Sequence, residues 1–223
     1  HKAAVPLSLD FCVGNRLILS KDKDAHFEFC LETEANEVQP GLYTNVTTIS
    51  PRYVACNLTG RVLVLSQHGQ TLDKSAEAIP HKGRLPLSWV DLKAGTKSPG
   101  VAIKLTDVSS DGNSEELTTR WSRKISTKMG RISISAPCGE CDEHVRVVKQ
   151  VKKQTTYLVF SLETAEEPTF RIENHTRGTK LHFAQRGFKV EKTVGPGERP
   201  VFSWIDPEAP SPKLVCQLEH EGK

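Results

Sequence analysis

The residues of this sequence that could do chemistry are thiols, imidazoles and carboxylates, and they do not form a known catalytic pattern. Cys138 and Cys141 make one Cys-x-x-Cys pair, but no second pair and no His-x-x-x-His is present to complete a zinc site. The sequence also lacks a Gly-x-Ser-x-Gly elbow and a glycine-rich phosphate loop ahead of a helix. It therefore predicts a protein that is not an enzyme and that uses no metal and no cofactor.

Two stretches of the chain share a polar pattern that suits binding better than catalysis. In each stretch an Asn precedes a Thr and a Gly, and an alternating apolar run then ends in Gln, 10 residues after Asn57 and 11 after Asn174. A Trp follows each Asn, Trp89 after 32 residues and Trp204 after 30. Landmarks that recur in one order with similar gaps predict an internal repeat with a period of about 120 residues.

The repeated Asn has two interpretations, and the sequence does not choose between them. Asn tolerates the left-handed region and bonds the nearby backbone, so it suits a tight turn between two strands. Alternatively, its amide anchors the backbone of a bound peptide. We assign Asn57 to the fold of the repeat and Asn174 to a candidate peptide site.

The repeated Trp residues are predicted to be core anchors. Trp89 and Trp204 each follow a Ser and precede an Asp by two positions, which are Asp91 and Asp206. A buried indole N–H needs a hydrogen-bond partner, and the neighbouring Asp is the nearest candidate.

Alternation of apolar and polar residues predicts strands along most of the chain, separated by Gly and Pro turns. We predict an all-β fold of tandem β-sandwich-like repeats with antiparallel sheets and little helix. The one helix candidate, 114–128, fits a strand equally well. The predicted strands are 7–11, 16–19, 26–32, 43–49, 52–57, 62–67, 85–89, 101–106, 131–135, 145–149, 157–162, 169–173, 180–185, 201–204 and 213–218.

The repeats predict a division of the chain. Residues 1–45 end a preceding repeat and supply linking strands, 46–165 form the first repeat, and 166–223 form the start and core of a second. Because the chain begins without Met and no signal pattern is seen, we expect it to be a fragment of a longer cytosolic protein with reduced thiols.

Composition limits the classes of partner that the protein could bind. The 223 residues carry a net charge of +3 with both signs interspersed, so no strong field favours nucleic acid. The densest basic run, 149–153, could contact anionic lipid, although Lys on a strand edge is ordinary. No apolar stretch is long enough to span a bilayer as a helix.

An extended peptide could add to the edge of such a sheet, where backbone bonds give affinity and side-chain pockets give specificity. Residues 157–185 are the richest in apolar strand positions. The candidate peptide-binding residues are Asn174, Tyr157, Phe160, Phe170, Ile172, Phe183 and Phe188.

The combination of motifs resembles one family. Ser50-Pro51-Arg52-Tyr53 followed by Asn57, and Pro196-Gly197 followed by Trp204-Ile205-Asp206-Pro207, are similar to repeats of the adaptor-binding (VAB, formerly SHR-binding) domain of vacuolar protein sorting-associated protein thirteen. The resemblance covers the whole chain. The first copy lacks the Pro-Gly turn and the Pro after Asp, so the second copy is the more typical repeat.

The resemblance implies a function. Proteins of this family are bridge-like lipid-transfer proteins, and their domain has six β-rich repeats, each with a characteristic Asn, here Asn57 and Asn174. The domain binds adaptors through a short Pro-x-Pro motif at its last repeats, and so directs the protein to membrane contact sites of endosome, vacuole or mitochondrion. The alternatives are an architectural spacer, a peripheral lipid-surface-binding module, or a secreted glycosylated module.

Overall fold

The computed structural model describes residues 13–22, 25–67, 72, 76–87, 89–90, 100–106, 120–138, 141–209 and 211–220. Its strands are β1 (Val13–Asp22), β2 (Ala25–Gln39), β3 (Leu42–Pro51), β4 (Tyr53–Leu58), β5 (Val62–Gln67), β6 (Glu77–Ile79), β7 (Arg84–Pro86), β8 (Trp89–Val90), β9 (Gly100–Thr106), β10 (Ile125–Ser126), β11 (Arg131–Cys138), β12 (Cys141–Lys152), β13 (Thr155–Leu162), β14 (Phe170–Arg171), β15 (Thr179–Gln185), β16 (Glu191–Val194), β17 (Val201–Phe202) and β18 (Leu214–His220). The described residues contain no α-helix, and the prediction of an all-β chain is confirmed.

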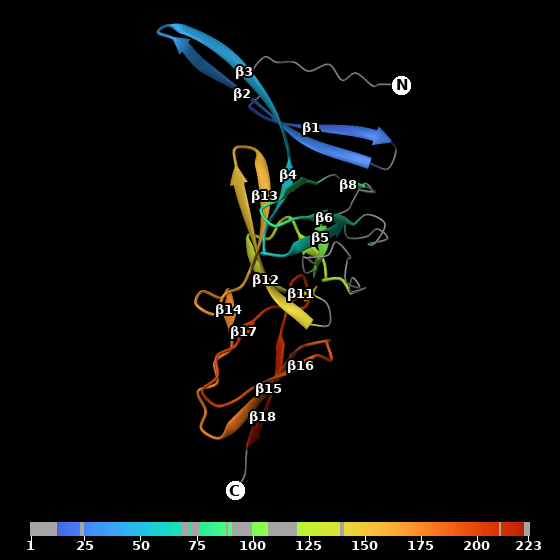
Figure 1. Ribbon diagram of the computed structural model, residues 1–223, viewed down its shortest axis with the longest axis vertical. Helices are drawn as coiled ribbons and strands as arrows, with labels where there is room; N and C mark the ends of the chain where they lie inside the picture. Colours follow the sequence, from blue (N-terminus) through green and yellow to red (C-terminus); the bar gives the residue numbers. More distant parts are fainter. Residues whose placement is uncertain are drawn as a thin grey trace, which may run out of the picture.

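The strands are arranged along one long axis (Figure 1). The meander β1–β2–β3 lies at one end and the small sheet β16–β15–β18 at the other. Between them a nine-stranded sheet runs in the order β6-β5-β9-β11-β12-β13-β4-β7, with β10 beside β9. Its two end strands, β6 and β7, are joined by a tight turn, so the sheet is nearly closed on itself.

The closed sheet encloses the main core. Alternate residues of its strands point inward, as the period of two requires. Trp89 and Phe160 are the largest fully buried side chains there, at 1% and 0% exposure. A smaller cluster of Phe183, Val194 and Phe202 forms the core of the C-terminal part.

Not every pairing is antiparallel. β13 runs parallel to β4 over six residue pairs, and β11 meets β9 in parallel at Cys138 and Leu105. The hairpin-connected strands β11, β12 and β13 form one unit that fills the space between β9 and β4. Since β4 and β13 are about a hundred residues apart, a long crossover separates them, and parallel neighbours require one.

Some predicted elements differ from the structure. The range 169–173 forms a strand only at β14, and 85–89 is divided between β7 and β8. Three short strands, β6, β10 and β16, were not predicted. Of the helix candidate 114–128, only the part from Arg120 onward is described, and it contains β10 and no helix. The predicted strand 7–11 lies outside the described residues.

Candidate functional site

Asn57 holds together the corner at which β4, β5 and β6 meet. Its side-chain amide nitrogen donates to the carbonyl oxygens of Arg61 at 2.8 Å and Ile79 at 2.7 Å. Its amide oxygen accepts from the backbone N–H of Thr59 at 2.9 Å and from the Thr59 hydroxyl at 2.7 Å. Asn57 is fully buried, so every polar group of its side chain is used within the protein.

Asn174 builds the same corner in the second copy. Its amide nitrogen donates to the carbonyls of Thr179 and Val194, both at 2.9 Å. Its oxygen accepts from the backbone N–H of Thr176 at 3.0 Å and from the Thr176 hydroxyl at 2.7 Å. The side chain is only 4% exposed, and its amide has no free donor for a ligand.

The backbone around the two corners also corresponds. Asn57 N–H bonds to the Gly83 carbonyl and Lys82 N–H to the Asn57 carbonyl. In the second copy, Asn174 N–H bonds to the Glu198 carbonyl and Gly197 N–H to the Asn174 carbonyl. The strands match accordingly: β5 lies between β6 and β9, and β15 lies between β16 and β18. The domain boundaries drawn from the sequence remain a prediction, and β3 crosses the one placed at 45.

An aromatic pair recurs next to each corner. Tyr53 packs edge-to-face on Trp89 with ring centroids 5.6 Å apart, and Phe170 packs the same way on Trp204 at 6.2 Å. In the first copy β13 pairs with β4 beside Tyr53, which is half-buried, and Trp89 is 1% exposed. In the second copy no described strand lies along the outer edge of β14, and Phe170 is 40% exposed.

The exposed end of this pair belongs to an aromatic cluster. Phe202 contacts Phe170 at 6.5 Å, Phe183 at 5.9 Å and Trp204 at 4.9 Å, in each case edge-to-face. Ile172, which directly follows β14, packs against the same cluster. Together Phe170, Ile172 and Trp204 form an apolar surface over the buried Phe202, beside a strand edge that no described strand pairs, and we call this surface the β14 edge site.

The predicted peptide-binding residues do not all come together. Phe170 and Ile172 lie at the β14 edge site. Phe183 is buried beneath it, and Phe160 is buried in the core of the nine-stranded sheet. Tyr157 lies on the outer surface of β13, while Phe188 stacks under the guanidinium of Arg123 at 5.6 Å.

The predicted partners of the Trp residues are placed as follows. Asp91 lies outside the described residues. The indole nitrogen of Trp89 is buried and has no hydrogen-bond partner among the described residues. Asp206 caps a turn, since its carboxylate accepts from the backbone N–H of Glu208 at 3.0 Å.

Gln185 has a structural role that the sequence did not reveal. It is 3% exposed, donates to the Asp206 carbonyl at 2.7 Å, and accepts from Ile205 N–H at 2.8 Å and Asp206 N–H at 3.1 Å. It therefore ties the end of β15 to the segment that follows Trp204. The recurrence of Gln at the end of both matched strands was the available signal.

A polar junction joins the two copies. The Nδ1 atom of His144, on β12, lies 2.6 Å from the hydroxyl oxygen of Ser203. Next to it, Ser135 N–H and the Ser133 carbonyl bond to the backbone of Trp204. Burial, and then the positive charge of Lys192, lower the pKa of His144 below its usual value against the opposing effect of nearby carboxylates.

Glu163 stabilises the chain where it leaves β13. Its buried carboxylate accepts from Arg146 at 2.7 Å and from the Thr169 N–H at 3.1 Å. Burial by itself would raise the pKa of Glu163, but these hydrogen bonds outweigh it and lower the pKa.

The described residues hold no group of His, Cys, Asp and Glu arranged to bind a metal ion. Cys138 and Cys141 lie opposite each other in the β11–β12 pairing, and no disulfide joins them. Among the described residues no helix has the length and apolar character needed to cross a membrane.

Comparison with models of protein families identifies a match. The family model for the adaptor-binding domain of vacuolar-sorting associated protein 13 matches residues 20–212. No curated protein matches the chain significantly. The family match includes both Asn corners, both aromatic pairs and the β14 edge site, and it confirms the resemblance in the sequence motifs. The chain therefore belongs to the family of the adaptor-binding domain of vacuolar-sorting associated protein 13, a family of protein-interaction modules.

Proposed function

We propose that this module binds adaptor peptides with a Pro-x-Pro motif by strand addition at the β14 edge site, and thereby directs a lipid-transfer protein to membrane contact sites at organelles such as endosome, vacuole or mitochondrion. The observation that carries the proposal is the difference between the two copies. The first has β13 along β4, and the second has an exposed aromatic surface and no described strand along β14.

The backbone groups at this edge are suited to accept a strand. Ile172 N–H bonds to the Pro200 carbonyl and Asn174 N–H to the Glu198 carbonyl, so these residues direct their backbone groups toward β17. Successive residues of a strand point to opposite sides, and the backbone groups of Arg171 and Glu173 therefore face the open edge. These donors and acceptors match the backbone of an added peptide.

A Pro-x-Pro sequence fits the edge of β14 because the backbone N–H groups of an extended peptide alternate between its two sides. Proline has no N–H, so both prolines must occupy positions whose backbone points away from β14, which leaves the middle residue to pair with it. Residues two apart share a face, so both rings then lie on one side of the sheet. Placed on the inner face, the two rings cover Phe170 and Ile172.

This arrangement fixes the direction of the peptide. In the parallel strand β13, the inward-facing Thr156 directs its N–H to β4, bonding the Arg52 carbonyl at 2.8 Å. A proline could not occupy such a position in a parallel peptide. Reversing the strand turns the backbone of inward-facing residues away from the edge, so we propose that the peptide runs antiparallel to β14.

The test is a calorimetric titration of the chain with a Pro-x-Pro peptide and with an Ala-x-Ala peptide. Phe170→Ala should weaken binding by about tenfold or more, as expected for an aromatic anchor at a protein interface. The control is Val46→Ala on β3, whose exposure of 42% is close to the 40% of Phe170.

Two results would overturn the proposal. One is equal binding of the two peptides by the folded chain. The other is an unchanged affinity of Phe170→Ala. Paramagnetic labels at either end of the peptide would show its direction, and a parallel peptide would contradict the assignment of the prolines to the inner face.

A further inference from the structure

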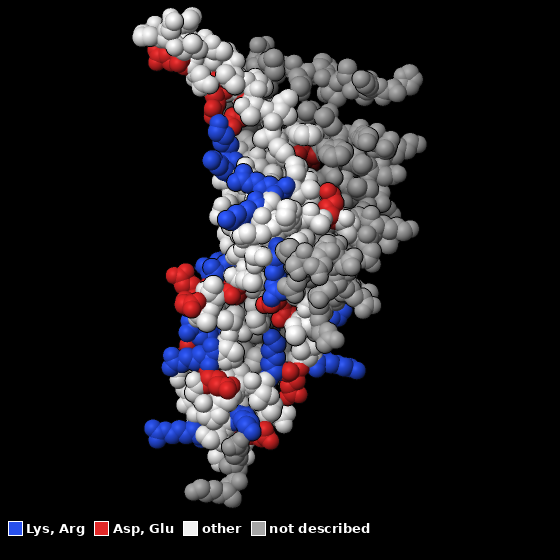
Figure 2. All heavy atoms as spheres, in the orientation of Figure 1, with Lys and Arg blue, Asp and Glu red and all other residues white. Residues whose placement is uncertain are grey.

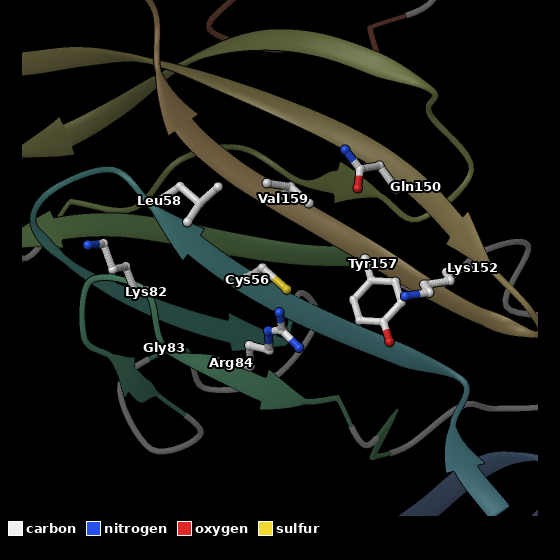
Figure 3. A pocket seen from close by; sticks show the side chains of 9 residues that line it. All are labelled: Cys56, Leu58, Lys82, Gly83, Arg84, Gln150, Lys152, Tyr157 and Val159. Carbon is white, nitrogen blue, oxygen red and sulfur yellow. The ribbon is translucent and has the colours of Figure 1, made fainter. Parts of the chain in front are cut away.

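A groove of about 420 Å³ opens on the outer surface of the first copy, away from the β14 edge site. It crosses β12, β13 and β4 and ends at β7 and the turn before it (Figure 3). Its apolar lining comes from Leu58, Tyr157 and Val159, whose side chains point outward from β4 and β13.

Three cations line the groove, and no carboxylate does. They are Lys82, Arg84 and Lys152, and none of them forms an ion pair with any described residue. The neighbouring Lys153 differs, because it bonds to Glu34 at 2.8 Å and lies 3.5 Å from Glu32. Figure 2 shows basic side chains gathered along this flank of the molecule, over the β12–β13 hairpin.

Lys82 is not required by the fold. Lys82 has a φ of 63°, and the matching position in the second copy is Gly197, with a φ of 81°. Both residues bond through their N–H to the carbonyl of the corner Asn, at 2.7 and 2.8 Å. A lysine at positive φ costs conformational free energy that glycine does not. A residue that is strained where its counterpart is not points to a role outside the fold.

The second copy also carries carboxylates at this place. By the same correspondence, Glu198 stands where the first copy has Gly83, and Glu173 stands where it has Cys56. Arg199 stands where the first copy has Arg84, so the first copy differs here by the cation of Lys82 and by the lack of carboxylates at these two positions.

We propose that this groove binds an extended acidic peptide segment of a partner protein. Lys82 lies at one end beside Leu58, Lys152 at the other beside Tyr157, and Arg84 between them (Figure 3). Cations spread along a groove suit several separate carboxylates, whereas one compact phosphate would not reach all three. The apolar side chains of the segment lie over Tyr157 and Val159.

The experiment is a fluorescence anisotropy titration of the whole chain. The probe is a labelled peptide in which Asp alternates with Ser and Val, and the control peptide has Asn in place of each Asp. Only the acidic peptide should bind, and more weakly as salt rises. Lys152→Gln and Arg84→Gln should each weaken binding by about two- to fivefold, and their combination by about tenfold.

Two variants separate binding from folding. Lys82→Gly removes a cation but installs the glycine of the second copy, so it should weaken binding while the melting temperature stays the same or rises. Lys153→Gln removes a paired lysine outside the groove and should leave binding unchanged.

Three outcomes would overturn the proposal. The first is equal binding of the Asn peptide. The second is a loss with Lys153→Gln as large as with Lys152→Gln, which would indicate unspecific attraction. The third is binding of phosphatidylserine vesicles through the three cations without binding of the acidic peptide, which would assign the groove to a membrane surface. None of these tests depends on the Pro-x-Pro peptide, so this site and the β14 edge site can fail separately.

Discussion

Replacing Asn174 by Ser distinguishes a fold-holding amide from a ligand-binding amide. Serine cannot reach both carbonyls, so the Thr179 and Val194 carbonyls lose their donor from residue 174. The Thr179 carbonyl still accepts a hydrogen bond from the Thr176 hydroxyl at 2.8 Å. The carbonyl of the fully buried Val194 loses its bond from residue 174. The hydrogen bonds accepted from Thr176 are weakened as well.

The expected cost follows from these bonds. A net hydrogen bond contributes about 1 kcal/mol, and an orphaned buried carbonyl adds about 1–3 kcal/mol, so Asn174→Ser should destabilise the second copy by about 3 kcal/mol. Asn57→Ser should cost about 4 kcal/mol, because Asn57 is completely buried and its loss leaves the buried Thr59 hydroxyl with only the longer bond to the Arg61 carbonyl, at 3.3 Å. Such losses are a large fraction of the stability of a domain.

Native-state hydrogen exchange with mass spectrometry locates the effect. In Asn174→Ser, peptides covering β15 and β16 should lose protection by about a hundredfold, while β4, β5 and β13 keep theirs. Asn57→Ser should show the reverse pattern. The control is Thr176→Ser, which keeps the hydroxyl that donates to Asn174. If Asn174→Ser kept full protection and yet lost the Pro-x-Pro peptide, the amide would be a ligand contact and our assignment would be refuted.

Two further predictions concern a link within the second copy and the junction between the two copies. Gln185→Ala should lower the free energy of unfolding by about 2–3 kcal/mol, because three hydrogen bonds to the segment after Trp204 are lost, whereas Gln217→Ala on exposed β18 should have no measurable effect in urea denaturation. For His144, the pKa in the folded state lies below the unfolded value of 6.5, so the unfolded state binds the proton more readily. The contribution of His144 to the free energy of unfolding is therefore complete above pH 6.5 and decreases as the pH falls below it. The melting temperature of His144→Asn should depend less on pH in that window than the melting temperature of the wild type. An equal dependence of melting temperature on pH in both proteins would contradict this linkage.

Local patterns were sufficient for most of the fold. The strands β5 and β15 alternate clearly and were predicted close to their bounds, whereas the longer strands β1, β2 and β12 were located but predicted too short. The strands β6 and β16 have three and four residues, too few for alternation to be distinguished from a loop. Parallel pairing of β13 with β4 depends on a long crossover, and no local pattern encodes it.

Less of the candidate site than of the fold could be predicted from the sequence. Asn57 and Asn174 were recognised as a matched pair, but their function in the structure depends on carbonyls 22 and 20 residues away. Aromatic and apolar residues between 157 and 185 were grouped by proximity in sequence, yet Phe160 is buried in the main core and Phe170 is exposed at the β14 edge site. In the first copy Phe160 lies beside Asn57, and the corresponding place beside Asn174 is open among the described residues. Sequence order alone does not show this difference.

The same comparison explains how one repeat unit can serve both fold and binding. In the first copy, β13 places the buried side chains of Leu158 and Phe160 beside Ala55 and Asn57, and the sheet is complete. In the second copy, the corner, the aromatic pair and the backbone direction of β14 are all preserved without such a strand in the described residues. An edge that is already organised for a strand loses little conformational entropy when a peptide binds, so most of the interaction free energy is available for affinity. Under the proposed function, the strand that the second copy lacks among its described residues defines the ligand: extended, apolar on one face, and without a required N–H at alternate positions.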